Sequence, residues 1–386
     1  MQPSSKRRLA GFTLIELMIA MAVTMILLYA AIVAFRDASL TNQVVTQNAD
    51  MADNLRAGLN LIQTDLQQAG SGIPTGGIPI PYTSNNSTTN PCSTIAAPNR
   101  PVLNGTTTFP ACNSTFPGVE PGQALGPLIT APDASAGLPS NPSSYTDEVT
   151  VFYVDNLGLD SKPINALPTT NPTTAGCPNG SLTLSGSTLK AVFDPNCINF
   201  TTAGIYINPG DLIMFSNTLG EAVLAVTSVS GQTLTFAPGD PFNLNGRSAS
   251  GGTINQLEAN GCGGSNVCFT NTTATRVWMV SYYLDNVTSP PYVRLIRQVG
   301  FNTPTPVGET MENMQFTYNF VDGNTNPSNQ PAVPAGDSES QIMAVNVYLA
   351  ARSSYKIHRG NNALYSRDNL VTQISLRSMA YHNAFQ

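Results

Sequence analysis

Charged residues are scarce in this sequence. Lys, Arg, Asp and Glu make up 10% of its 386 residues, and the net charge is −6. Asn, Thr, Ser, Gly and Pro supply most of the polar character instead. With so few cations, the surface offers no basic stripe for nucleic acid, and we expect no nucleic-acid partner. The length suits one large or two ordinary domains, and we expect one domain with an additional anchor.

Catalytic motifs are also lacking. The two histidines, His358 and His382, lie near the C-terminus without the spacing of metal ligands. The sequence contains no nucleophile elbow, phosphate loop, zinc protease motif or dinucleotide fingerprint. Acid pairs such as Asp147 and Glu148 occur in any chain and do not by themselves indicate acid–base catalysis. We therefore predict a protein that is not an enzyme and has no cofactor.

One segment resembles a calcium loop, because oxygen-bearing side chains occupy every second position. Pro327 stands where such a loop has glycine, and Val333 stands where it has the bidentate acid. An Asn-rich hairpin loop is therefore favoured over a metal site. The weak calcium candidates are Asp322, Asn324, Asn326 and Ser328.

The six cysteines fall into three neighbouring pairs within loop-like segments. This spacing predicts three local disulfides formed in an oxidising compartment. Free or metal-binding thiols are the alternative, although no second His or Cys pair completes a zinc set with Cys262 and Cys268. Each disulfide would contribute about 2 to 3 kcal/mol. The predicted pairs are Cys92 with Cys112, Cys177 with Cys197, and Cys262 with Cys268.

The N-terminus contains a long apolar run. Lys6, Arg7 and Arg8 precede residues Phe12 to Phe35, which would span about 36 Å as a helix and cross a bilayer. The basic residues should stay in the cytoplasm. Glu16 interrupts the run at a cost of at most about 2.5 to 3.5 kcal/mol. The many Leu, Ile, Val and Phe residues outweigh that cost, so we expect the segment to insert.

An ordinary secretory signal peptide explains this run less well. The run is too long for a signal core, and no small-residue cleavage site follows it. Phe35, Arg36 and Asp37 lead directly into further helix-compatible sequence. A plain signal anchor explains neither the acid at Glu16 nor the glycine at Gly11.

The segment from Gly11 to Ala20, GFTLIELMIA, resembles the class III signal of type IV prepilins. The resemblance implies that a prepilin peptidase cleaves between Gly11 and Phe12, that Phe12 is N-methylated, and that the apolar segment is retained. Arg36 lies about 30 Å from Glu16 along a helix, so Glu16 lacks a cation within the chain. In pilins the corresponding acid meets the new amino terminus of an adjacent subunit, which implies an assembly role for Glu16.

The helix is predicted to continue beyond the membrane. Apolar residues from Leu55 to Ala69 recur at spacings of four and three, as on an amphipathic helix. Gly70, Gly72 and Pro74 then favour its end. We expect this stripe to pack on the chain's own globular head.

The remainder of the chain is predicted to be rich in β-strands. Residues 75–145 read as long surface loops. Strand-like segments follow, among them Leu182 to Phe193, Thr233 to Phe236 and Ile342 to Ala350, the last of which alternates clearly from Val345 to Leu349. The sequence therefore predicts an α+β fold with one long N-terminal helix packed on a β-rich, pilin-like head. The expected parts are a leader peptide at 1–11, a transmembrane segment at 12–35, an amphipathic continuation at 36–72, and a head at 73–386 with a small inserted β-subdomain at 180–245.

The head resembles minor pilins of the PilW type. Val149 to Tyr153 resembles the family's first head strand, and Arg276 to Ser281 with Val293 to Arg297 resembles its strand pair. Segments beginning at Glu309 and Arg367 follow in the family's order. The resemblance implies a priming or tip role in a type IV pilus-like filament, beside other minor and major pilins and a large tip adhesin.

It also implies an inner-membrane precursor, in contact with lipid and with its head in the periplasm, that later joins a surface filament. A minor pseudopilin of a type II secretion system has the same leader and helix, and neighbouring genes would separate the two. A membrane-anchored surface adhesin is compatible with the loop-rich residues 75–145. An anchored hydrolase is disfavoured, because the sequence lacks catalytic motifs.

Overall fold

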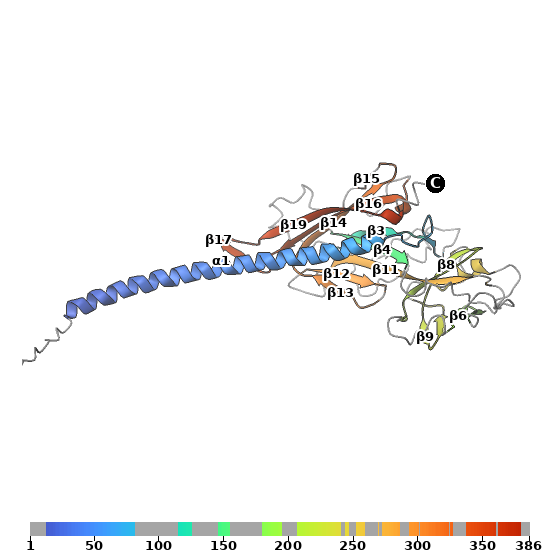
Figure 1. The fold of residues 1–386 in the computed structure, drawn as a ribbon, viewed down its shortest axis with the longest axis horizontal. Coiled ribbons are helices and arrows are strands. Elements are labelled where there is room, and N and C mark those ends of the chain that lie inside the picture. Colours follow the sequence, from blue (N-terminus) through green and yellow to red (C-terminus); the bar gives the residue numbers. More distant parts are fainter. Residues whose placement is uncertain are drawn as a thin grey trace, which may run out of the picture.

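The computed structural model of the chain has one long helix and a head built from β-sheets (Figure 1). This composition confirms the predicted α+β fold. The structure describes residues 13–81, 115–125, 146–154, 180–194, 207–240, 244–246, 252–258, 269, 272–285, 293–300, 302–323, 325–326, 337–359 and 362–379.

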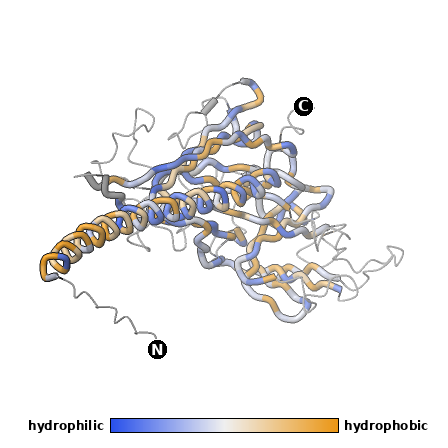
Figure 2. Tube along the Cα trace, turned by 60° about the vertical axis from the view of Figure 1, so that its left-hand side comes forward, coloured by the Kyte–Doolittle hydropathy of each residue, from blue (hydrophilic) through white to orange (hydrophobic). Residues whose placement is uncertain are grey.

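Helix α1 (Leu14–Gln68) has two halves with different surroundings. Residues 14–35 are exposed on every side and make the apolar end of the helix seen in Figure 2. The second half buries Met51, Leu55, Ile62 and Leu66, which share one face of the helix at spacings of four, seven and four. The predicted stripe therefore packs on the head, as expected.

The helix ends slightly earlier than predicted. Ala69 is its C-terminal cap, and the N–H of Ala69 donates to the carbonyl of Leu66. Gly70 follows with a φ of 74°, a left-handed conformation that favours glycine and cannot continue the helix. The amide of Gly70 then donates to the carbonyl of Phe152, so the chain passes directly from the helix onto the sheet.

The main sheet has seven strands, and β11 is the longest of them. The N-terminal part of β11 pairs with β7, while its C-terminal part pairs with β4 on one side and β12 on the other. One 13-residue strand therefore joins the two ends of the head. The strands are β3 (Val119–Leu125), β4 (Thr146–Val154), β7 (Leu212–Asn217), β8 (Gly220–Ala225), β11 (Thr273–Asp285), β12 (Arg294–Val299) and β13 (Thr305–Gly308).

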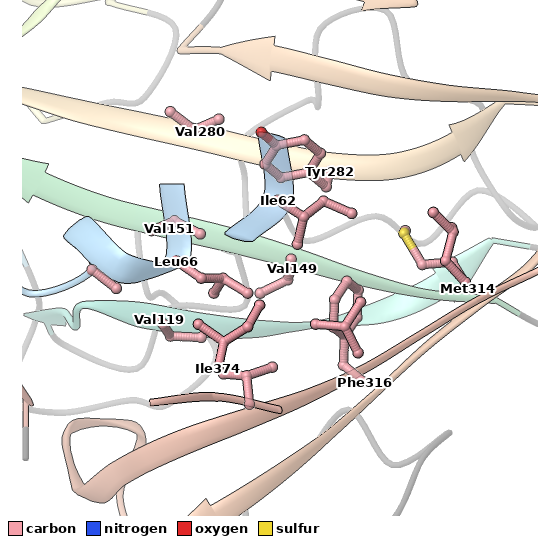
Figure 3. Packing of buried hydrophobic residues seen from close by; sticks show 14 of the residues in the cluster. Ile62, Leu66, Val119, Val149, Val151, Val280, Tyr282, Met314, Phe316 and Ile374 are labelled. Atoms are coloured by element: carbon pink, nitrogen blue, oxygen red, sulfur yellow. The ribbon is translucent and has the colours of Figure 1, made fainter. Parts of the chain in front are cut away.

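A second sheet, with the order β15-β14-β16-β19, faces the main sheet. Ile62 and Leu66 of α1 belong to the core cluster that fills the space between the sheets, together with Val149 of β4 and Ile374 of β19 (Figure 3). The helix is thus the central element of this core. The strands of the second sheet are β14 (Met311–Phe320), β15 (Thr325–Asn326), β16 (Ile342–Arg352) and β19 (Arg367–Ser375).

A third sheet lies at the other end of the head and has the order β5-β6-β10-β9. It covers the β7–β8 part of the main sheet through its own apolar cluster, in which the rings of Phe215 and Phe236 pack edge to face with centroids 5.3 Å apart. The strands are β5 (Ser181–Ser185), β6 (Thr188–Val192), β9 (Ser228–Ser230) and β10 (Thr233–Phe236).

Strands β5 to β10 all lie within the range where the sequence indicated an inserted β-subdomain. They divide between two sheets, because β7 and β8 extend the main sheet while the other four form the third sheet. The remaining elements are β1 (Ile78–Pro79), β2 (Thr115–Phe116), β17 (Ile357–Arg359), β18 (Asn362–Leu364), and the 3-10 turns Ile254–Leu257 and Glu339–Gln341.

Two expectations about local structure were wrong. Residues 182–193 form two strands rather than one, because Gly186 adopts a φ of 59° and turns the chain between β5 and β6. The loop-like segment 75–145 contains β3, which forms one edge of the main sheet. Pro121 and Gly122 conceal this strand in the sequence, and proline is tolerated there because an edge strand has one unpaired side.

Candidate functional site

Glu16 lies in the first turn of α1 and takes part in its N-terminal cap. Its Oε2 accepts hydrogen bonds from the backbone N and from Oγ1 of Thr13, both at 3.2 Å. The amide of Glu16 donates in return to Oγ1 of Thr13 at 3.3 Å. This reciprocal pattern is a capping box, and it keeps the negative charge near the positive end of the helix dipole.

The cap bears on the predicted processing site, because Thr13 directly follows Phe12. Gly11 and Phe12 lie outside the described residues, so cleavage and methylation there stay predictions. The capping box was missed in the sequence analysis, although the spacing Thr13-x-x-Glu16 is its usual signal.

The apolar half of α1 has no cover from the rest of the described chain. Leu14 and Phe35 are both 78% exposed, and Tyr29 is 72% exposed. The helix is long and apolar enough to cross a membrane. The hydroxyl of Thr24 suits an apolar surrounding, since it donates to the carbonyl of Ala20 at 2.7 Å. Such a surface requires lipid or other apolar helices around it.

Asp65 fastens the head-side half of α1 to the main sheet. It is 5% exposed, and Nε and a terminal nitrogen of Arg297 donate to its two carboxylate oxygens at 2.8 and 3.2 Å. The hydroxyl groups of Tyr153 and Tyr282 also donate to Asp65. One carboxylate of α1 therefore contacts side chains from β4, β11 and β12.

The charges in this cluster support one another. Burial lowers the pKa of Arg297, but the hydrogen bond and the charge of Asp65 outweigh it and raise that pKa overall. Burial, followed by the charge of Asp65, raises the pKa of Tyr282. The guanidinium of Arg297 therefore stays charged and the hydroxyl of Tyr282 stays neutral across the physiological range. Asp65 was not predicted from the sequence, although its signal is an acid within the apolar stripe between Ile62 and Leu66.

A second set of carboxylates lies where β3, β4 and β14 meet. Glu120 is buried, and burial together with the nearby charge of Glu339 raises its pKa well above the usual value. Asp147 is buried as well, and its Oδ2 accepts a hydrogen bond from the amide of Phe316 at 2.8 Å. Within the described ranges, no group of His, Cys, Asp and Glu has an arrangement that could hold a metal ion.

The other residues singled out in the sequence lie largely outside the described ranges. All six cysteines do so, and the three disulfides stay a prediction. Of the calcium candidates, Asp322 follows β14, the backbone of Asn326 belongs to β15, and Asn324 and Ser328 are not described. The calcium loop therefore stays a hypothesis.

Comparison with known proteins links the N-terminus to a family motif. The model of the prokaryotic N-terminal methylation motif matches residues 6–32. No curated protein sequence matches the chain significantly. A type IV-like pilin from Thermus thermophilus is similar at 13% identity over 45% of this chain and 87% of that chain, with a TM-score of 0.18. Such a score carries no argument by itself. The N-terminus of the chain therefore carries the methylation motif of prepilin leaders, which supports a subunit of the type IV pilin family.

Proposed function

We propose that the chain is a minor pilin, a structural subunit of a type IV pilus-like filament. The observation that carries the proposal is the match of the methylation motif to residues 6–32, on a helix whose residues 14–35 are exposed and apolar. The precursor is anchored in the inner membrane with its head in the periplasm, and it is later extracted into the filament.

The apolar half of α1 serves both stages. In the membrane, lipid covers its side chains, and in the filament the equivalent helices of neighbouring subunits cover them. Since the second half of α1 is already packed in the head, extraction moves the apolar half without rearranging the core. The helix and the head therefore move as one rigid unit during extraction.

Glu16 supplies the charge that pairs subunits. Both hydrogen bonds from Thr13 go to Oε2, so the cap does not use Oε1. A carboxylate accepts several hydrogen bonds, so Oε1 of Glu16 suits the amino terminus of Phe12 in an adjacent subunit. An ion pair of this kind strengthens where water is scarce, and losing one partner leaves the other charge buried alone.

The minor role rests on the head, which resembles the PilW type. The proposed task is priming of assembly or a position at the filament tip. The proposed partners are the prepilin peptidase that acts at Gly11, the other minor and major pilins, and a large tip adhesin.

Substitution of Glu16 by leucine tests the proposal. It removes an insertion penalty of up to about 2.5 to 3.5 kcal/mol, so a simple membrane anchor tolerates or prefers it. A filament subunit loses its charge partner instead. We expect intact membrane insertion and cleavage after Gly11, but at least about tenfold less protein in sheared filaments relative to membranes, because the partner charge is left buried alone.

The matched control is Thr24→Leu, which removes a polar group from the same apolar segment without changing charge. N-terminal sequencing verifies cleavage in both variants. If Glu16→Leu keeps the parental ratio of filament to membrane protein, the chain is a membrane-tethered surface protein and the proposal is wrong.

A further inference from the structure

A positively charged hairpin extends from the end of the second sheet. We define the basic hairpin as residues 352–359 and 362–367, which include β17 and β18. It holds four of the chain's 17 Lys and Arg residues and none of its 23 Asp and Glu residues. Arg367 is paired with Glu312 through two contacts of 2.8 and 2.9 Å. Arg352, Lys356 and Arg359 therefore give this segment a local positive charge within an acidic protein.

The base of the hairpin is held firmly by the sheet. The amide of Ser353 donates to the carbonyl of Ser366 at 2.8 Å, and the amide of Ser366 donates to Oγ of Ser353 at 3.0 Å. Arg352 and Arg367 form the last registered pair between β16 and β19. The hairpin is thus a continuation of these two strands, and their direction sets its direction.

That direction leads along α1 towards its N-terminal half, as β17 shows in Figure 1. Leu349 of β16 packs next to Gly58 of α1. The three residues of strand from Leu349 to Arg352 cover about 10 Å, and so do the seven residues of helix from Gly58 back to Met51. Arg352 therefore lies near the level of Met51. Arg359 lies seven residues beyond Arg352, and because the chain bends at Ser354 and Tyr355 between β16 and β17, it extends at most about 23 Å farther. Phe35 lies 16 residues beyond Met51 along the helix, about 24 Å. The hairpin therefore extends alongside α1 towards the level at which the apolar run ends (Figure 1).

The side chains of the hairpin combine cationic, aromatic and apolar groups. Tyr355 is 65% exposed and Leu364 is 58% exposed. The guanidinium of Arg352 lies 4.3 Å from the ring centroid of Tyr365, and Nζ of Lys356 lies 5.3 Å from the same centroid. Aromatic and basic side chains together are typical of segments at the membrane–water interface.

We propose that the basic hairpin binds the anionic lipid headgroups that surround the exit of α1 from the bilayer. This inference rests on the membrane-anchored precursor of the proposed function. Cations close to an anionic surface are attracted to it, while Tyr355 and Leu364 enter the interfacial layer. The head is then fixed at two points, α1 and the hairpin, until extraction separates the hairpin from the lipid.

Hydrogen exchange of the full-length chain in nanodiscs, with one chain per disc, tests the inference. The discs contain either phosphatidylcholine alone or a mixture with phosphatidylglycerol. We expect amides of residues 353–359 and 362–366 to exchange at least about fivefold more slowly with the anionic lipid. Lys356→Glu abolishes this slowing, since it changes the charge by two units and each unit near such a surface changes affinity by about fivefold. Lys190→Glu makes the same change at an exposed lysine of β6 in the third sheet, and it keeps the slowing.

The exchange of amides 14–35 reports separately on insertion of α1. If those amides are protected but the hairpin exchanges equally in both lipids, the inference is wrong and the proposed function stands. If amides 14–35 are unprotected in both lipids, the membrane anchor itself is wrong. A slowing that survives in Lys356→Glu also overturns the inference.

Discussion

At the scale of single residues, Asp65 has the largest number of described polar contacts between the helix and the sheets. Arg297 and two tyrosines satisfy its carboxylate, and the arginine side chain is 27% exposed. A buried ion pair of this kind is costly to break, because the remaining partner stays desolvated without its counter-charge. The cluster thereby fixes the rotation of α1 about its own axis relative to the main sheet.

Replacing Asp65 by alanine should lower the free energy of unfolding by about 3 kcal/mol, the lower end for a broken buried pair, because Arg297 is partly exposed. The matched control is Asp53→Ala, which breaks the exposed pair with Arg56, 3.8 Å apart on the same helix. That variant should change the free energy by less than about 0.5 kcal/mol. Urea unfolding of both measures the difference, and equal effects would show that Asp65 does not fasten the helix.

Glu120 makes stability depend on pH in a definite direction. Its folded-state pKa is raised by burial and by Glu339, so between the ordinary value near 4.5 and the raised value the folded chain binds more protons than the unfolded chain. The free energy of unfolding therefore falls as pH rises through this window, by at most about 1.4 kcal/mol per pH unit.

Replacing Glu120 by glutamine should remove this slope and raise the melting temperature at pH 7, with little change at pH 4. Thermal melts across that pH range provide the measurement. Glu309→Gln, which removes an exposed acid just before β14, serves as the control and should keep the parental slope. A Glu120→Gln variant with the parental slope would exclude this role for Glu120.

At the scale of elements, a close contact between two backbone segments determines how the segment after α1 packs. It joins that segment to the end of the head that contains the third sheet. Gly252 has a φ of 68°, and a Cβ at this position would lie 1.9 Å from the carbonyl oxygen of Ile80. No side chain fits there. This contact holds Ile80, which follows β1, against Gly252, which precedes the 3-10 turn Ile254–Leu257.

The change Gly252→Ala should therefore destabilise the head far more than Gly231→Ala. Gly231 has a similar φ of 56°, but a Cβ there meets no atom within 4 Å. The control should cost about 1 kcal/mol from backbone conformation alone. The clash at Gly252 should add about 2 kcal/mol or more. Denaturant unfolding of the two variants isolates the contact, and equal costs would contradict it.

At the scale of the whole molecule, the two halves of α1 make separate contributions to stability. Residues 14–35 bury none of their side chains in the described chain, whereas Met51 and Leu55 are almost fully buried in the main core. The head is therefore expected to fold without the apolar half of the helix but not without the second half.

Deletion of residues 1–35 should leave the free energy of unfolding within about 0.5 kcal/mol of the parental value and yield a head extractable without detergent. Deletion of residues 1–55 removes Met51 and Leu55 as well, and should lower it by at least about 4 kcal/mol. Calorimetry of both truncated chains in the same buffer makes the comparison. A large loss on the shorter deletion would show that the apolar half stabilises the head.

The sequence alone determined the features that depend on local chemistry. A run of apolar residues after Lys6, Arg7 and Arg8 specifies a membrane-length helix whatever follows, and the GFTLIE motif is contiguous. The amphipathic stripe after Leu55 is periodic, so its burial could be predicted. Strands such as β16 and β10 alternate clearly and were predicted close to their observed bounds.

Only the tertiary structure decided which distant residues meet. Asp65, Tyr153, Tyr282 and Arg297 are separated by up to 232 positions, and no periodicity links them. Strand β3 was hidden because its Pro and Gly residues have low β-propensity, and pairing with β4 overrides that preference. The joining of two ends of the head by β11, and the alignment of the basic hairpin with α1, likewise follow from long-range pairing. Local sequence sets which segments become helices and strands, whereas the burial of apolar surface between them sets where they lie.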